Sequence, residues 1–440
     1  MGHPKDRRAL TREQLLRRAA GSAAAVSGIG LLAGCENTTT PVGAGAQGPS
    51  GPAGKLVVAK PTGPGGLPLP RPDNAVTWAI TDTNKPIPEG RSTERGPLRV
   101  YNYADYLDPA TLKVFEKTYH TKVQVATYNS ADEAIAKLAA GAVAFDVIVG
   151  LTGSNIVNLI AQQLLQPLRH AYLPNLAKNI WPVLQDPFYD RGSRYTVPYV
   201  VWNDGIGWRN DVVKADIAAM DVPWDIFWHS GAYRGRVGLL DDKRDALSMP
   251  MQRDAMRTGE RPDLNTEDPD LISKAERDLE ELSRICSIKV VITDYQTLPE
   301  KKTVLHHSWS GDLLSAAVFY LPKGVKPEVL SYWGPSQNGV VQNDFLCIGR
   351  AAKSPVLAHR FLDFFLDEKN AYNNFVNFVG YTPPQNAIDA DALIKQGVIP
   401  KTLTRAVVRP DQFAVNQELL QLSIEGERRW DDAWSKFRAG

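Results

Sequence analysis

The chain has 440 residues, of which 43% are hydrophobic and 22% are charged, and its formal net charge is +1. This apolar content can bury a large core, and the near-neutral charge gives no sign of a nucleic-acid-binding protein. The charge is unevenly distributed, because residues 1–34 hold six Lys or Arg against two Asp or Glu. The rest of the chain is therefore mildly acidic.

The first 34 residues have the layout of a secretory signal. Five arginines precede the apolar segment 19–32, which is too short to span a bilayer. The segment ends in Leu-Ala-Gly-Cys35, which resembles the bacterial lipobox, where a signal is cut before a cysteine that becomes lipidated. We therefore expect a signal peptide at 1–34, a lipid on Cys35, and a cell-envelope lipoprotein in the periplasm or on the outer face of the cytoplasmic membrane. A buried apolar helix with an incidental cysteine is the alternative, and the export route stays open because Glu13 stands where a twin-arginine signal has its second arginine.

Residues 36–97 contain 11 Pro and 10 Gly in 62 positions, a composition that does not build a core. We expect residues 35–97 to form a lipid-anchored tether that holds a folded body at the membrane surface. The remaining cysteines, Cys286 and Cys347, lack the close spacing of a metal or redox motif. Whether they form a disulfide outside the cytoplasm stays open.

The folded body begins with strands and helices in alternation. Strands are predicted at 98–103, 122–128 and 145–149, with helices at 109–119, capped by Asp108, and at 130–140. Such alternation predicts a mainly parallel α/β sheet, whose ligands lie beyond the carboxyl ends of its strands. These ends are Tyr103–Tyr106, Asn129 and Thr152–Asn155.

A second half of similar size follows a crossover at 196–210, where Pro198 precedes an aromatic and β-branched run that Gly205 and Gly207 interrupt. We expect this run to leave one sheet and enter another. Further strands are predicted at 235–240, 290–294 and 304–308, with a helix at 273–285. The chain then returns near 340–348, continues in a helix around 358–378 and crosses again near Tyr381. Lobe 1 is therefore expected to comprise 98–200 with about 340–385, and lobe 2 to comprise 201–339 with about 386–440.

Seven motifs occur in the same order as in the periplasmic spermidine/putrescine-binding proteins of ABC transporters. They are Val100-Tyr-Asn-Tyr-Ala-Asp-Tyr-Leu107, Phe145–Val149, Tyr195-Thr-Val-Pro-Tyr199, Trp224-Asp-Ile-Phe-Trp228, Tyr233-Arg-Gly235, Leu239–Asp245 and Val379-Gly-Tyr-Thr-Pro-Pro384. The resemblance runs from about Leu98 to Gly440. It implies a two-lobed, type II periplasmic-binding-protein fold of the α/β class, monomeric and without cofactor, that closes on a polyamine and presents it to an ABC permease.

The resemblance also implies a binding site. Asp242 and Asp245 match an acidic pair, with aspartate replacing the usual glutamate at 245, and Asp344 matches the acid after the return crossing. The other matched or strand-end positions are Tyr103, Asp105, Tyr106, Thr152, Trp309, Asp312 and Tyr381. A polyamine needs carboxylates for its ammonium groups and aromatic walls for its methylenes.

Plainer roles compete with these assignments. Asp242 and Asp312 are placed to cap helices or to complement helix dipoles, Trp309 to fill a core and Tyr381 to pack a turn. The chain also has less aromatic surface than the family usually has, because Tyr103 stands where the family has tryptophan, and Gly153 and Gln342 stand where it has other aromatic residues. We therefore expect a cationic ligand, and a short diamine or guanidino-amine rather than spermidine.

Other functions have less support. The sequence holds no Gly-x-Ser-x-Gly and no His-Glu-x-x-His, so we expect no enzyme. His306 and His307 are adjacent, and neighbours on a strand point to opposite faces, so we expect no metal site there. A solute-binding protein for another ligand, or a sensor or scaffold lipoprotein on the same fold, stays an alternative.

Overall fold

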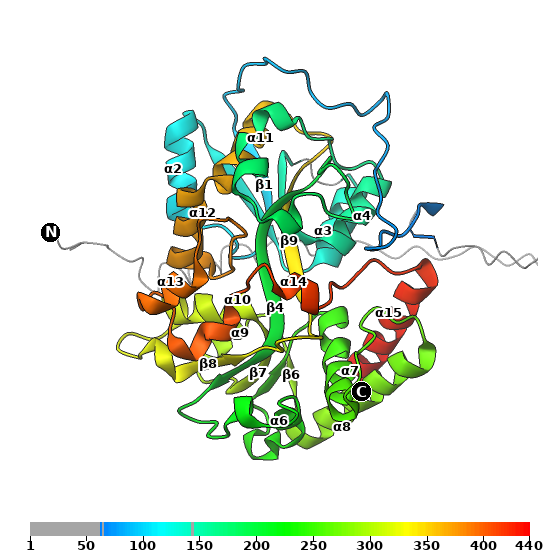
Figure 1. Ribbon diagram of the computed structural model, residues 1–440, viewed down its shortest axis with the longest axis vertical. Coiled ribbons are helices and arrows are strands. Elements are labelled where there is room, and N and C mark those ends of the chain that lie inside the picture. Colours follow the sequence, from blue (N-terminus) through cyan, green and yellow to red (C-terminus); the bar gives the residue numbers. More distant parts are fainter. Residues whose placement is uncertain (1–61, 64–65, 142–144) are drawn as a thin grey trace, which may run out of the picture. The chain divides into compact units, whose positions relative to one another are not determined.

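A strand of 13 residues, β4 (Val197–Arg209), joins the two halves of one sheet (Figure 1). Its first part, Val197–Asn203, pairs with β9 (Val341–Ile348), and its last part, Asp204–Arg209, pairs with β7 (Leu305–Trp309) and β8 (Leu330–Trp333). The predicted crossover between the two halves is confirmed, but the strand crosses within one continuous sheet and does not pass from one sheet to another.

The computed structural model describes residues 62–63, 66–141 and 145–440, all of which lie in the compact unit Ala59–Gly440. The predicted signal peptide, the lipidation residue Cys35 and the start of the predicted tether lie outside these residues. The cysteines that were left open, Cys286 and Cys347, are both buried and free.

The sheet has the strand order β2-β1-β3-β9-β4-β7-β5-β6, and β8 pairs with β4 beside this path. The strands not yet given are β1 (Leu98–Tyr103), β2 (Val123–Tyr128), β3 (Val147–Thr152), β5 (Val237–Leu239) and β6 (Lys289–Val290). The outer strands of each half pair in parallel, as predicted, whereas the pairings of β4 and of β9 are antiparallel. The sheet is therefore mixed, because the chain returns between the halves through these two strands.

Local sequence explains where the helices begin. Asp108 accepts hydrogen bonds from the amides of Ala110 and Thr111, both at 3.0 Å, and Pro109 occupies the first helical position. The α-helices are α2 (Pro109–Tyr119), α3 (Ala131–Ala139), α4 (Gly153–Ala161), α5 (Pro174–Asn179), α6 (Asp225–Trp228), α7 (Lys243–Thr258), α8 (Pro269–Cys286), α9 (Asp294–Thr297), α10 (Ser310–Ser315), α11 (Pro355–Leu366), α12 (Glu368–Asn374), α13 (Ala390–Lys395), α14 (Gln412–Val415) and α15 (Ile424–Ala439). The helix predicted around 358–378 is therefore two helices, because Asp367 ends α11 and caps α12.

Each half has its own core. In the first half, Leu98, Val149 and Leu346 of the sheet pack with Phe361 and Phe365 of α11. In the second half, strands β4, β5 and β7 pack with helices α7, α8 and α15 around the fully buried rings of Trp224 and Trp430. Residues near the carboxyl terminus thus complete the second half.

The described part of the predicted tether packs on the first half. Val76 and Trp78 are buried in a core cluster with Tyr189, and the Trp78 indole donates to the Tyr189 carbonyl at 2.7 Å. Glu94 accepts from the first amides of α11. Residues 66–97 therefore pack against the first half. The Pro and Gly content of this stretch predicted a tether, but a few apolar and capping side chains anchor it.

Candidate ligand-binding site

A cavity with about 740 Å³ of empty space, partly open to solvent, lies where the two half-sheets meet at β4 and β9. Eight of the ten predicted binding residues line it, from both halves: Tyr103, Tyr106, Thr152, Asp242, Asp245, Trp309, Asp344 and Tyr381.

Asp344 is the acid of the first half. It lies on β9 opposite Thr152 of β3, is 4% exposed, and accepts from the Tyr106 hydroxyl at 2.7 Å and the Trp202 indole at 3.1 Å. Burial raises the pKa of Asp344 to about 6, although both hydrogen bonds oppose the rise. Its carboxylate is therefore held in place by neutral donors, while its charge stays uncompensated.

Asp242 and Asp245 are the acids of the second half, at the start of α7. Asp242 accepts hydrogen bonds from the amides of Arg244 and Asp245, so it caps α7. The same residue also lines the cavity. Asp245 is buried and accepts from the Trp309 indole at 3.0 Å. Burial raises the pKa of both carboxyls, and the negative charges of Asp204 and Asp242 raise that of Asp245 further.

Asp312 is outside the cavity lining. It lies in the first turn of α10, is 5% exposed, and accepts from the Tyr381 hydroxyl at 2.8 Å. Burial and the nearby buried Asp294 raise its pKa. Asp312 therefore stands behind Tyr381, which itself lines the cavity.

Asp105 is also outside the cavity lining. Its backbone is in the left-handed region, with φ of 58°, and its carboxylate accepts from the hydroxyls of Tyr295 and Tyr320 at 3.1 Å each. Asp105 belongs to the loop after β1, whereas the two tyrosines lie on α9 and on the π-helical segment Ala316–Tyr320. Asp105 thus links the two halves beside the cavity.

Aromatic rings form the walls between the acids. The rings of Trp202 and Trp309 lie 5.5 Å apart between centroids, and those of Tyr106 and Tyr381 lie 4.8 Å apart. Trp202 was missed by the sequence analysis, although it lies in the predicted crossover strand where a cleft was expected. It adds aromatic surface beside the positions that lack the family's usual aromatics.

Arg244 is a second lining residue that the sequence analysis missed. Its guanidinium donates to the carbonyls of Leu264 and Leu420 and to the side chain of Asn265, and it lies 4.5 Å above the Trp430 ring. Those four partners, together with the Glu427 carboxylate at 3.9 Å, hold the cation in the second half. Arg244 therefore orders the start of α7 and the segment before α15.

The structure also bears on metal binding and on membrane-spanning helices. Among the described residues, no group of three His, Cys, Asp or Glu side chains is placed to hold a metal ion. None of the helices in the described ranges combines the length and hydrophobicity that crossing a bilayer requires.

The chain is similar in sequence to known bacterial solute-binding proteins. The family model for bacterial extracellular solute-binding proteins matches residues 110–401. The putrescine/cadaverine-binding protein of Pseudomonas aeruginosa is 26% identical over 360 residues, which are 79% of this chain and 95% of that protein. The spermidine/putrescine-binding periplasmic protein 1 of Haemophilus influenzae is 24% identical over 73% of this chain and 83% of its own length.

Solved structures confirm the predicted two-lobed fold. The spermidine/putrescine ABC transporter substrate-binding protein PotD of Streptococcus pneumoniae gives a TM-score of 0.60 at 21% identity. The match covers 78% of this chain and 98% of that one.

Proposed function

Because this chain belongs to the family of bacterial extracellular solute-binding proteins, we propose that it captures a polyamine or related cationic amine and delivers it, as a monomer, to an ABC permease. The family binds solutes for transport, which agrees with the prediction that the chain is no enzyme. One observation supports the proposal most directly: four acids, Asp241, Asp242, Asp245 and Asp344, line a cavity walled by Trp202 and Trp309.

The chemistry of the cavity fits a ligand with at least two positive charges. Carboxylate–ammonium hydrogen bonds are of the strong, charge-assisted kind, and aromatic faces add about 0.5–2 kcal/mol per cation. Asp344 lies in the first half, and Asp242 and Asp245 lie in the second, so a diamine can place one ammonium group in each half. Leaving these buried carboxylates unpaired in a closed cavity is costly, which disfavours neutral and anionic ligands.

Calorimetric titration of the purified protein tests this function. We expect putrescine, cadaverine and agmatine to bind with dissociation constants near micromolar, which corresponds to about −8 kcal/mol. Neutral and anionic solutes serve as controls. Tighter binding of such a solute than of any diamine would favour a solute-binding protein for another ligand, and the absence of any saturable ligand would favour a sensor or scaffold.

The membrane anchor is part of the same proposal and rests on the sequence before the described residues. We expect the mature chain to begin at a lipid-modified Cys35, and Cys35→Ala to leave the protein unlipidated and released from membranes. Intact-mass measurement of the membrane fraction checks this. A mature chain that starts elsewhere and carries no lipid would contradict it.

Closure on the ligand should depend on Asp105. Asp105→Ala removes the acceptor of two hydrogen bonds between the halves, and hydrogen bonds to charged groups contribute about 1.5–3 kcal/mol each when shielded from water. Because Asp105 is exposed, we expect a smaller effect, a threefold to tenfold weaker diamine affinity.

Solution scattering provides the second measurement. Ligand should reduce the radius of gyration of the wild-type protein, and less ligand-induced compaction is expected for Asp105→Ala. The double variant Tyr295→Phe/Tyr320→Phe removes the donors and should reproduce both effects. Unchanged affinity and scattering in both variants would show that this contact does not support closure.

A further inference from the structure

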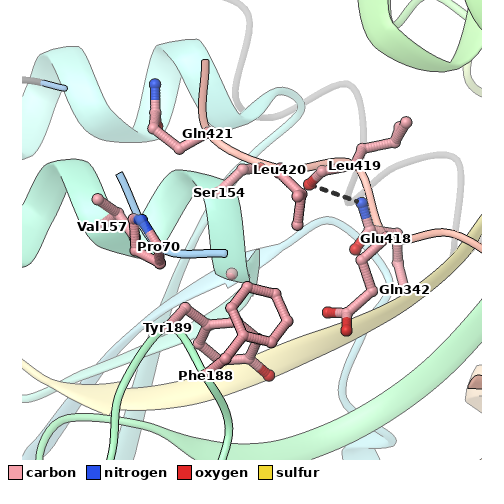
Figure 2. A pocket seen from close by; sticks show the side chains of 11 residues that line it. Pro70, Ser154, Val157, Phe188, Tyr189, Gln342, Glu418, Leu419, Leu420 and Gln421 are labelled. Atoms are coloured by element: carbon pink, nitrogen blue, oxygen red, sulfur yellow. Dashed lines mark hydrogen bonds between the residues drawn. The ribbon is translucent and has the colours of Figure 1, made fainter. Parts of the chain in front are cut away.

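One side of the main cavity offers no room for a ligand. Ser154, Gln342 and Leu419 line both the cavity and a small space beside it, where the Gln342 side chain donates to the Leu419 carbonyl at 3.3 Å (Figure 2). The volume of that space is about 10 Å³, which is room for about one water molecule. The ammonium groups of a bound amine therefore have to meet the acids that line the main cavity itself.

Asp204 of β4 is a further carboxyl group, and it lies behind Asp245. Asp204 pairs with Trp309 of β7, and the Trp309 indole donates to Asp245 at 3.0 Å. The side chains of Asp204 and Asp245 are themselves in hydrogen-bonding contact. Asp204 is fully buried and does not line the cavity, whereas Asp245 does. A ligand in the cavity can therefore reach Asp245 but not Asp204.

The contact between these two acids needs a proton. Both side-chain oxygens of Asp204 and the Oδ1 atom of Asp245 are buried, and the described part of the chain supplies no hydrogen-bond donor to them. Two carboxylates have only acceptor atoms, and two like charges in one buried site do not readily ionise together. The geometry is therefore that of a carboxyl pair in which one proton lies between the two acids.

The surrounding groups do not replace this proton. The titratable or charged side chains that face the pair are Asp242, Arg244, His307 and Tyr332. The Nε2 atom of His307 lies 3.5 Å from Asp204, which is long for a hydrogen bond. Arg244 and Tyr332 donate to other groups, and Asp242 adds a negative charge. Burial and the two neighbouring acids together raise the pKa of Asp245.

We propose that Asp204 is a positioning residue that keeps a shared proton on Asp245 in the empty protein, and that an amine releases this proton when its ammonium group binds Asp245. The inference rests on the proposed amine-binding function and deepens it. An ammonium group forms its ion pair with a carboxylate and not with a neutral carboxyl group. The O–H bond of Asp245 therefore breaks as the ion pair forms, and its proton passes to the solvent.

Calorimetry of putrescine binding at pH 7, in phosphate and in Tris, counts the released protons, because the two buffers differ in their heat of protonation. We expect the wild type to release at least about half a proton per putrescine. Asp344, with a pKa of about 6, accounts for only about a tenth of a proton. In Asp204→Asn the amide can donate to Asp245 without titrating. The release should therefore fall to less than about half of the wild-type value, with an affinity within about threefold of wild type or tighter.

Asp294→Asn is the matched control. Asp294 is also fully buried and also in hydrogen-bonding contact with another acid, Asp312, but neither of these two acids lines the main cavity. We expect this variant to release as many protons as the wild type. Asp204→Ser, whose hydroxyl group can also donate to Asp245, repeats the test in case asparagine does not fit the buried site.

The remaining outcomes separate this inference from the proposed function. Unchanged proton release in Asp204→Asn and Asp204→Ser would overturn the shared proton. So would a wild-type protein that binds putrescine and releases no more than the share of Asp344, since the proton would then be absent or kept within the protein. An equal loss of release in Asp294→Asn would show a general effect of buried acids and would also overturn it. Wild-type protein that binds no amine would overturn the proposed function as well.

Discussion

Asp344→Asn should weaken diamine binding at least tenfold while the empty protein stays as stable as the wild type. Losing one partner of a buried charge pair costs about 2–5 kcal/mol, enough to move a micromolar affinity toward millimolar. The asparagine oxygen can still accept from Tyr106 or Trp202, so the local packing is retained. The substitution also removes a carboxylate whose pKa is raised by burial, so it removes an unfavourable charge from the empty protein.

Calorimetry and thermal unfolding check this result together. Asp242→Asn is the matched variant in the second half, because asparagine caps helices as well as aspartate does and should preserve the start of α7. We expect the same loss of affinity from it. Wild-type affinity in both variants would show that these acids serve only as acceptors and caps within the protein.

The second large effect is a loss of amine affinity on acidification. Asp344 has a pKa of about 6 in the empty protein, and its charged form is the one that pairs with ammonium. Amines stay protonated throughout this range, so only the protein titrates. Protonation of Asp344 alone should weaken binding about tenfold between pH 7.5 and pH 5. The raised pKa values of Asp242 and Asp245, which also line the cavity, act in the same direction.

Titrations at several pH values check the size and the origin of this effect. We expect Asp344→Asn to bind diamine weakly at every pH and with a shallower pH dependence than the wild type. Affinity that is constant from pH 7.5 to pH 5 would mean that the binding acids keep ordinary pKa values, or that they do not meet the ligand.

The fold was largely predictable because its main signals are local. Asp108 before Pro109 predicts the start of α2, and the glycines within an otherwise apolar run mark the bending strand β4. Gly205 illustrates the reason: a Cβ atom there would come within 2.1 Å of the Trp333 carbonyl oxygen. The segment 66–97 was not predictable from composition, since a few anchoring side chains such as Trp78 and Glu94 decide its packing.

The cavity was predictable in part, because motifs identify a position but not the direction of its side chain. Asp105 and Asp312 come from the expected loops, yet the tyrosines that bind them lie far away in the sequence. Trp202 sits in a strand that is buried along its whole length, so no alternation marks the residue that faces the cavity.

If Cys35 carries a lipid, the packed segment 66–97 limits how far the binding cavity can stand from the membrane. With a lipid on Cys35, a tether that ended at residue 97 would span roughly 200 Å when fully extended, at about 3.5 Å per residue. Because the chain is fixed to the first half from about Leu69 onward, only some 30 residues remain, and they span at most about 120 Å. The body would thus stay within a short radius of its anchor, which raises its local concentration at any permease in the same patch of membrane.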